Sequence, residues 1–294
     1  MLPDFRGRAV FCAHRRLLGK GMDTLRMGRL EIGRGRPCII VPLTSSDPAA
    51  LEEEAESLAS LPADMVEWRV DMFCAPTGVD ERAVLSALSG LRERIQVPIL
   101  ATFRTEDEGG CCPLSDEGYA SLCAGLCRSG NIDLLDVEAF FRSGNAGSII
   151  AAAHACGVPV VASNHDFHAT PPKDEIVRRL LYMQDELDAD ILKIAVMPRS
   201  RADVLTLLSA TEEASRLAHR PVISMSMGPL GVISRVCGQI FGSAATFGAA
   251  KKASAPGQMD VCSLDTVLRT LELACGQSGE QPVPSAIGKG GPRH

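Results

Sequence analysis

The stretch DILKIAVMP, residues 190–198, sets one lysine, Lys193, in the middle of a short aliphatic run. Such a run is typical of a strand buried on both faces of a parallel sheet. Seven similar runs alternate with helical patterns or polar loops, and they recur about every 29 residues, close to the ~30 of a βα unit. The eight runs begin near Cys38, Met65, Pro98, Asp133, Pro159, Ile191, Pro221 and Ala244. Eight successive βα units predict a single-domain (β/α)8 TIM barrel of the α/β class.

Composition and charge narrow the class of protein. The 294 residues carry a formal net charge of −6, and no stripe of Lys and Arg with interleaved aromatics is present, which argues against nucleic-acid binding. No apolar run approaches the ~18 residues of a membrane-spanning helix, and the first residues lack the apolar core of a secretion signal. We therefore expect a cytoplasmic protein with a small-molecule partner, and neither nucleic acid nor membrane.

The eleven cysteines allow two interpretations, structural thiols or a metal site. Cys123 and Cys127 are four apart on a predicted helix, and Cys111 adjoins Cys112, but no CxxC pair recurs at zinc-site spacing. Without a secretion signal the thiols are expected to be reduced. The pattern favours structural cysteines and predicts no metal.

Capping residues mark several helix starts in the predicted barrel, which we assign to residues 22–275. Asp47 with Pro48, Ser115 and Ser263 each precede a helical pattern, and Gly130 offers a left-handed stop. Residues 1–21 are strongly basic and are interpreted as a disordered or non-native extension, with initiation at Met22. Residues 276–294 are rich in Gly, Pro and Ser, and we expect a disordered tail.

Polar residues gather at the carboxyl ends of the predicted strands, where a barrel of this kind carries its active site. Glu67, Arg69 and Asp71 alternate along the second strand, so all three are predicted to face the barrel interior. The third strand is expected to end at Arg104, with Glu108 in the loop that follows. The fifth ends in the segment SNHDFH, residues 163–168.

Lys193 is the most informative of these residues, because a lysine inside a buried strand must be paired, solvated through a pocket, or neutral. One interpretation is a structural ion pair with an acid such as Glu67 or Glu138. The other is a nucleophile: burial and nearby cations, from a set including Arg69, Arg104 and Arg235, would leave some free amine to attack a carbonyl. The sequence pattern alone leaves both interpretations open.

His165 also has alternatives, as a loop histidine, a metal ligand with His168, or a general acid and base beside Lys193. A spacing of three on an extended loop does not bring two imidazoles onto one metal. Proton transfer is therefore favoured over metal binding, although spacing does not choose between the two histidines.

Seven motifs, in order from about residue 22 to 274, together resemble the type I 3-dehydroquinate dehydratase family. They are EWRVDMF (67–73), TFRTEDEGG (102–110), SNHDFHATP (163–171), KIAVMP (193–198), MSMGPLGVISR (225–235), FGSAATFG (241–248) and KASAPGQ (252–258). Two departures from the family's pattern are Pro42, where some members have a serine, and Gly228-Pro229-Leu230, which replaces a polar stretch.

The resemblance implies roles for eleven residues. Lys193 matches the Schiff-base lysine, His165 the general acid and base, and Glu108 the carboxylate that orients this histidine. The substrate-binding set comprises Arg235 for the substrate carboxylate, Ser254 and Gln258 on a closing loop, Glu67, Arg69 and Arg104 near the hydroxyls, and Met225 and Phe247 as apolar walls.

The implied reaction is the syn elimination of water from 3-dehydroquinate, giving 3-dehydroshikimate on the shikimate pathway to aromatic amino acids. The resemblance implies no cofactor, because an iminium serves as the electron sink, and it implies a homodimer. Three alternatives are a class I aldolase, a metal-dependent lyase using His165 and His168, and a catalytically silent barrel that binds a metabolite.

Overall fold

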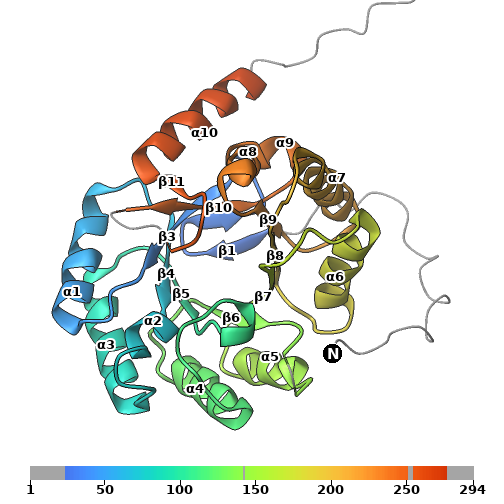
Figure 1. Cartoon of the computed structure of the whole chain (residues 1–294). Helices are drawn as coiled ribbons and strands as arrows, with labels where there is room; N and C mark the ends of the chain where they lie inside the picture. The colour runs from blue at the N-terminus through green and yellow to red at the C-terminus, as the bar shows by residue number, and fades with distance from the viewer. Residues whose placement is uncertain (1–23, 142, 251–253, 277–294) are drawn as a thin grey trace, which may run out of the picture.

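The computed structural model describes residues 24–141, 143–250 and 254–276, and its centre is a closed parallel barrel (Figure 1). Its strands are β3 (Cys38–Leu43), β4 (Met65–Arg69), β5 (Ile99–Thr102), β6 (Leu134–Glu138), β7 (Val160–Asp166), β8 (Ile191–Val196), β9 (Val222–Ser226) and β10 (Ala245–Ala249). They pair in chain order, and β10 pairs with β3. A parallel bridge between Val222 and Ser243 joins the last two strands and closes the ring. The predicted (β/α)8 barrel is confirmed, and each strand begins within one residue of its predicted start.

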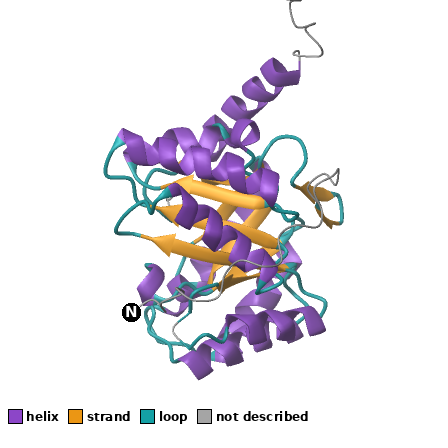
Figure 2. Cartoon of the chain, turned by 90° about the vertical axis from the view of Figure 1, so that its right-hand side faces the viewer, coloured by secondary structure: helices purple, strands orange, loops and turns teal. Residues whose placement is uncertain are grey.

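Helices surround the barrel, as the side view shows (Figure 2). The helices are α1 (Pro48–Ser57), α2 (Val70–Cys74), α3 (Glu81–Arg94), α4 (Asp116–Arg128), α5 (Ala146–Ala155), α6 (Lys173–Asp185), α7 (Arg201–Leu217), α8 (Val232–Val236), α9 (Gly238–Phe241) and α10 (Val261–Gly276), with 3-10 turns η1 (Leu58–Ser60), η2 (Glu106–Glu108) and η3 (Pro229–Gly231). No helix in the described part of the chain has both the length and the apolar character needed to cross a membrane.

Two of the three predicted helix caps are confirmed and one is wrong. The Asp47 side chain accepts from the amide of Ala50, and Ser115 accepts from the amide of Gly118. Ser263 instead lies inside α10, whose first turn is capped by Asp260 through the amides of Cys262 and Ser263. The carboxylate satisfies amide groups that have no helical partner.

Short elements that the sequence did not reveal complete the fold. β1 (Leu25–Met27) and β2 (Leu30–Ile32) form an antiparallel hairpin, whose apolar side chains pack against the interior cluster of the barrel. β11 (Met259–Asp260) adds to the edge of β10 beyond the segment 251–253. The predictions for residues 1–21 and 277–294 lie outside the described residues.

The barrel interior has an apolar lower half and a polar upper half. The lower half is filled by the larger part of one apolar cluster, which also reaches the upper half through Met225 and Phe247; its lower members include Ile40, Met65, Leu100, Leu134, Val161, Ile191 and Ile223. Two residues further along several of the same strands, the buried side chains are Glu67, Thr102, Asp136, Ser163 and Lys193. Thr102 is paired with Asp136 and Ser163 with Lys193, whereas Glu67 is opposite Leu100, so the staggered strands bring these polar groups above the apolar layer toward the carboxyl end of the barrel.

Three aspartates at the opposite end join neighbouring strands. Asp64, Asp133 and Asp190 directly precede β4, β6 and β8, and each carboxylate accepts from a backbone amide near the start of the strand before it, Ile39, Ile99 and Val160 respectively. A cationic or imidazole side chain also contacts each carboxylate: Arg36, Arg92 and His154 respectively. These contacts lie far from the polar upper half, so we assign them to stability.

Candidate active site

The upper end of the barrel holds a cavity that is lined by all eleven residues named from the resemblance. Its lining includes Glu67, Arg69, Arg104, Glu108, His165, Lys193, Met225, Arg235, Phe247, Ser254 and Gln258. They come from six strands or the segments that follow these strands. The fold therefore brings residues that are spread over nearly two hundred positions of the sequence into one cavity.

Lys193 is buried in β8, with 3% of its surface exposed, and its amine faces two carboxylates. Nζ lies 3.1 Å from Asp136 Oδ2 and 3.5 Å from Glu67 Oε1. The Phe247 ring packs against the ammonium at 4.9 Å from its centroid. Glu67 was a predicted ion-pair partner, whereas Glu138, the other one, instead contacts Arg104 and Thr105.

Asp136 links the lysine to a second buried cation. Its Oδ1 accepts from Arg104 at 2.8 Å and from Ser163 at 2.7 Å, while Oδ2 faces Lys193. Burial by itself raises the pKa of Asp136, but Arg104 and then Lys193 outweigh burial and leave the pKa below its ordinary value. The carboxylate is therefore charged and holds both cations at fixed positions.

His165 and Glu108 form a hydrogen-bonded pair beside the lysine. His165 Nδ1 lies 2.8 Å from Glu108 Oε2, and the backbone amide of His165 donates to the same oxygen at 2.9 Å. Asn164 donates to Glu108 Oε1 at 3.0 Å. Because these neighbours donate to Glu108, Nδ1 is best assigned as a donor too, which leaves Nε2 as the basic nitrogen.

Burial governs the ionisation of this pair. Burial, with Arg104, Lys193 and Arg69 in support, lowers the pKa of His165 well below its ordinary value. Burial and then the Glu138 carboxylate raise the pKa of Glu108 to about 8, against the opposing effects of Arg104 and Asn164. The imidazole is therefore neutral near pH 7, and the charge on Glu108 depends on the donors around it.

Arg235 is a buried cation without an acidic partner among the described residues. Only 1% of its surface is exposed, and its guanidinium contacts Met225 Sδ at 3.8 Å and the Pro256 carbonyl oxygen at 3.1 Å. Its Nε has no hydrogen-bond partner in the part of the chain that the structure describes, and burial lowers the pKa of Arg235 to about 10. A buried guanidinium with free donors favours an anionic ligand in the cavity.

The segment 254–258 covers this arginine. Ser254 and Gln258 bond to each other twice, and the amide of Gly228 donates to the Pro256 carbonyl oxygen. A Cβ atom on Gly257, whose φ is +79°, would lie 2.4 Å from the carbonyl oxygen of Gly228. The glycine at 228, one of the departures from the family's pattern, therefore lies directly beneath the loop.

Asp71 is not on the strand where the alternation put it. β4 ends at Arg69, and Asp71 lies in the first turn of α2, where it still binds Arg69 through a 2.7 Å ion pair. Its buried carboxylate holds the guanidinium in the cavity wall. Arg104 likewise follows β5, whose last residue is Thr102. Pro42, the other departure, is buried in β3 opposite Glu67.

Comparisons with known proteins identify the family of this chain. The model of the type I 3-dehydroquinase family matches residues 39–274. This chain belongs to the type I 3-dehydroquinase family. It is 50% identical over 251 residues to the 3-dehydroquinate dehydratase of Listeria monocytogenes serotype 4a, a match that covers 85% of this chain and 98% of that protein. The enzyme of Escherichia coli O9:H4 is 48% identical over 255 residues, covering 86% and 100%.

Solved structures of the family have the same barrel. The type I 3-dehydroquinate dehydratase of Clostridium difficile, solved with covalently modified comenic acid, aligns with a TM-score of 0.82 at 44% identity, covering 86% of this chain and 99% of that one. The enzyme of Geobacillus kaustophilus aligns with a TM-score of 0.81 at 39% identity, covering 85% and 97%.

Asp136 and Asn164 are the two residues at the site that were missed from the sequence. Asp136 and Glu138 alternate on β6 as Glu67 and Arg69 do on β4, so the same spacing signal was present. Asn164 lies in a quoted motif, but its polar side chain was given no role. Both are buried and contact residues that line the cavity.

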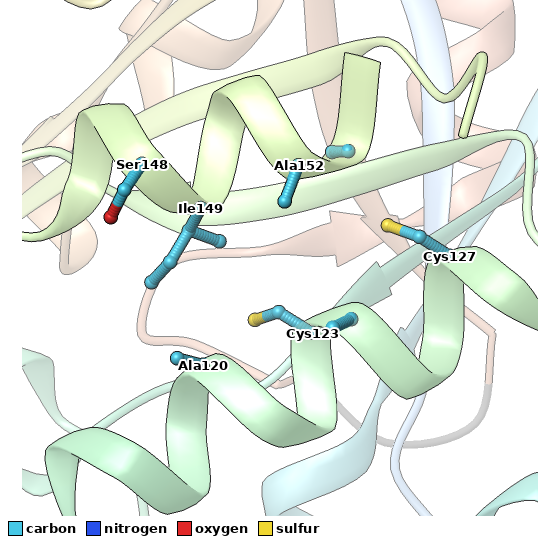
Figure 3. A pocket seen from close by; sticks show the side chains of 8 residues that line it. Ala120, Cys123, Cys127, Ser148, Ile149 and Ala152 are labelled. Carbon is cyan, nitrogen blue, oxygen red and sulfur yellow. The ribbon is translucent and has the colours of Figure 1, made fainter. Parts of the chain in front are cut away.

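A second hollow lies outside the barrel, between α4 and α5 (Figure 3). Its lining is small and mostly apolar: Ala120, Cys123, Ala124, Cys127, Ser148, Ile149, Ala152 and Ala153. Burial raises the pKa of the Cys123 thiol above its ordinary value, so this cysteine is a poor nucleophile.

His168 is exposed and does not line the cavity at the upper end of the barrel. Within the described ranges, no group of three or more His, Cys, Asp and Glu residues is arranged to hold a metal ion.

Proposed function

We propose that this chain dehydrates 3-dehydroquinate to 3-dehydroshikimate, with Lys193, His165 and Glu108 as its catalytic residues. The observation that carries the proposal is one cavity that contains both a buried amine and the guanidinium of Arg235, which has no acidic partner within the described ranges. The substrate offers a matching pair of groups, a ketone for the amine and a carboxylate for the guanidinium. Membership of the type I 3-dehydroquinase family supports the same reaction.

Lys193 begins the reaction as the nucleophile. Its ammonium first loses a proton, for which Asp136 Oδ2 at 3.1 Å is the nearest acceptor in contact. The free amine adds to the substrate ketone, and loss of water gives an iminium. The positive iminium nitrogen takes the place of the ammonium between Asp136 and Glu67, so those carboxylates also stabilise the intermediate.

His165 transfers the proton that the elimination requires. The iminium acidifies the adjacent carbon, and the neutral Nε2 removes a proton there to give an enamine. The enamine expels the tertiary hydroxyl group, which leaves as water with that proton from His165. Glu108 supports both steps, because a carboxylate at Nδ1 orients the ring and stabilises the transient imidazolium. Hydrolysis of the product iminium restores the Lys193 amine and releases 3-dehydroshikimate.

The remaining residues hold the substrate in register. Arg235 binds the carboxylate, and the loop with Ser254 and Gln258 closes above it. Glu67, Arg69 and Arg104 supply charged hydrogen-bonding groups for the hydroxyls, and Met225 and Phe247 form apolar walls. Fixing the ring this way aims the correct proton at His165. Arg235, Ser254 and Gln258 suit a carboxylate, and this gives less support to an aldolase that acts on phosphorylated sugars.

Borohydride trapping tests the mechanism. The protein is mixed with 3-dehydroquinate and borohydride, and its intact mass and peptide map are recorded. We expect an adduct only on the peptide that contains Lys193, with no adduct in Lys193→Ala. If 3-dehydroshikimate accumulated in the ultraviolet assay without any adduct, the activity would stand and the iminium would be wrong.

Three finer predictions accompany this function. We propose that the enzyme works as a homodimer in the cytoplasm and needs neither a metal nor an organic cofactor, because the iminium serves as the electron sink. Light scattering on a sizing column measures the oligomeric state. Dialysis against a chelator tests the metal, and loss of activity that zinc restores would contradict that prediction.

A further inference from the structure

A chain of polar contacts connects the outer helix α6 to the catalytic carboxylate. We propose that Arg179 is a positioning residue, which fixes the Asn164 amide so that this amide donates to Glu108, the hydrogen-bond partner of His165. The inference rests on the proposed function and adds a residue that does not line the cavity.

The contacts form a continuous path. Arg179 Nη1 donates to Asn164 Oδ1 at 3.0 Å, and Asn164 Nδ2 donates to Glu108 Oε1 at 3.0 Å. Arg179 is itself held by Glu175, which accepts from its Nε at 2.7 Å, and its guanidinium lies 5.9 Å from the centroid of the Phe140 ring. Only 12% of the Arg179 side chain is exposed, so solvent screens these contacts weakly.

Arginine decides which way the amide faces. An asparagine side chain has an accepting and a donating end, and either end could face Glu108. A guanidinium has no acceptor, so Arg179 can bind only Oδ1, and Nδ2 must then face Glu108. Without Arg179 the amide is free to turn and present its oxygen, which would repel the carboxylate.

Glu108 is sensitive to this donor because its other neighbours oppose one another. Glu138 and Asp136 on β6 raise the pKa of Glu108, and Arg104 lowers it. Oε2 accepts from His165 and contacts Arg104 at 3.5 Å, whereas Oε1 accepts from Asn164. Lys193 and Arg69 face the imidazole from β8 and β4 and act on His165.

The prediction has a definite sign. A hydrogen bond to the charged form lowers the pKa of a carboxyl group, so losing the Asn164 donor favours protonated Glu108. A protonated Glu108 cannot stabilise the imidazolium formed during proton transfer. The acid limb of the kcat/KM profile should therefore move to higher pH, and kcat should fall more than KM rises.

The chain contains a matched control for the test. Arg178 pairs with the same Glu175 at 2.8 Å from the same helix, whereas the donor to the Asn164 side chain is Arg179. Comparing Arg179→Met with Arg178→Met separates the loss of a helix ion pair from the loss of the amide contact. Thermal unfolding of both variants checks that the fold is kept.

The experiment measures pH profiles of kcat and kcat/KM for the wild type, both arginine variants, Asn164→Ala and the double variant Asn164→Ala/Arg179→Met. We expect kcat at pH 7 to fall about tenfold in Arg179→Met and at least as far in Asn164→Ala, the scale of one hydrogen bond to a charged group. Arg178→Met should stay near the wild type. The double variant should match Asn164→Ala, because Arg179 acts through Asn164.

Several outcomes would overturn the inference. An unshifted profile in Arg179→Met, an equal shift in Arg178→Met, or fully additive losses in the double variant would each show that Arg179 does not act through the amide. If Arg179→Met failed to fold, a wild-type profile in Asn164→Ala would decide against the inference. An inactive wild type would instead contradict the proposed function, so the two failures remain distinguishable.

Discussion

The two halves of the barrel interior are built on the same strands and have opposite chemistry. On β6, Leu134 belongs to the apolar lower cluster, and Asp136, two residues later, binds Lys193 and Arg104. On β8, Ile191 and Lys193 divide in the same way. Both halves are buried, so burial alone does not distinguish a core from an active site.

The difference lies in how each half satisfies its side chains. The side chains of the lower half need only apolar contacts, so an amino-acid substitution there lowers stability through lost packing. The upper half holds cations and carboxylates that are costly to bury, and each one depends on its neighbours for compensation. Substitutions in the two halves should therefore affect different measurements.

The largest effect is expected from Lys193→Ala. This change removes the nucleophile, so turnover should fall by about 10⁴-fold or more. The circular dichroism spectrum should stay native, because the lower half of the barrel is untouched. Appreciable dehydration by this variant would rule out the iminium mechanism.

His165→Ala should lower kcat by about 10² to 10⁴-fold, the range for loss of a general acid and base. The variant should still form the imine that borohydride traps, because Lys193 is unchanged. His168→Ala is the control, since His168 is exposed and lies outside the cavity. A stall at proton transfer in the His168 variant would reverse the assignment.

Leu134→Ala changes the lower half of the barrel on β6, the strand that also carries Asp136 in the upper half. A buried leucine exchanged for alanine typically lowers the free energy of unfolding by about 2–5 kcal/mol. The kcat of the folded fraction should stay within about twofold of wild type, because Asp136 keeps its contacts. A large loss of kcat at full folding would mean that the two halves are not separable.

Asp190→Ala addresses the bottom of the barrel. It leaves the Val160 amide and His154 without their 2.9 Å acceptor, which should reduce stability by about 1–3 kcal/mol. Denaturant unfolding measures the loss, and kcat/KM should not change. A kinetic defect would show that the lower end is coupled to the chemistry.

The smallest effect concerns the ionisation of His165. Its pKa lies well below the ordinary value because of burial, Arg104 and Lys193, in that order. Removing the lysine charge in Lys193→Ala should raise the pKa of His165, because one cation no longer disfavours the imidazolium. Histidine ring signals in NMR titrations follow the change, and an unmoved midpoint would exclude an effective interaction between the two residues.

The eight strands could be predicted because each one is a buried aliphatic run with a nearly constant spacing. The hairpin of β1 and β2 escaped prediction because its strands have three residues each, and Ile32 is the one fully buried side chain among these six. Alternation extended the second strand through Asp71, although the backbone turns into α2 after Arg69. Period-two spacing does not reveal where a strand ends.

For the site, the motifs identified the eleven residues that line the cavity, but not how they pair. The partner of Lys193 was expected among Glu67 and Glu138, and the register of the strands brings Asp136 closer than either. Distances of this kind depend on the stagger between strands, which the sequence does not reveal. Their individual catalytic roles remain predictions.

The aspartates at the lower end of the barrel join its strands in pairs. Their carboxylates link three of the four successive pairs of strands: Asp64 links β3 to β4, Asp133 links β5 to β6, and Asp190 links β7 to β8. Between β9 and β10 the residue at the equivalent position is Ala244. Its backbone makes the matching contact, but its side chain has no carboxylate to add a second one. This pair, β9 and β10, also carries Arg235 and the loop over the cavity. We therefore expect amide hydrogen exchange at the lower end of the barrel to be fastest in β9 and β10, the pair of strands that also leads into the segment over the cavity.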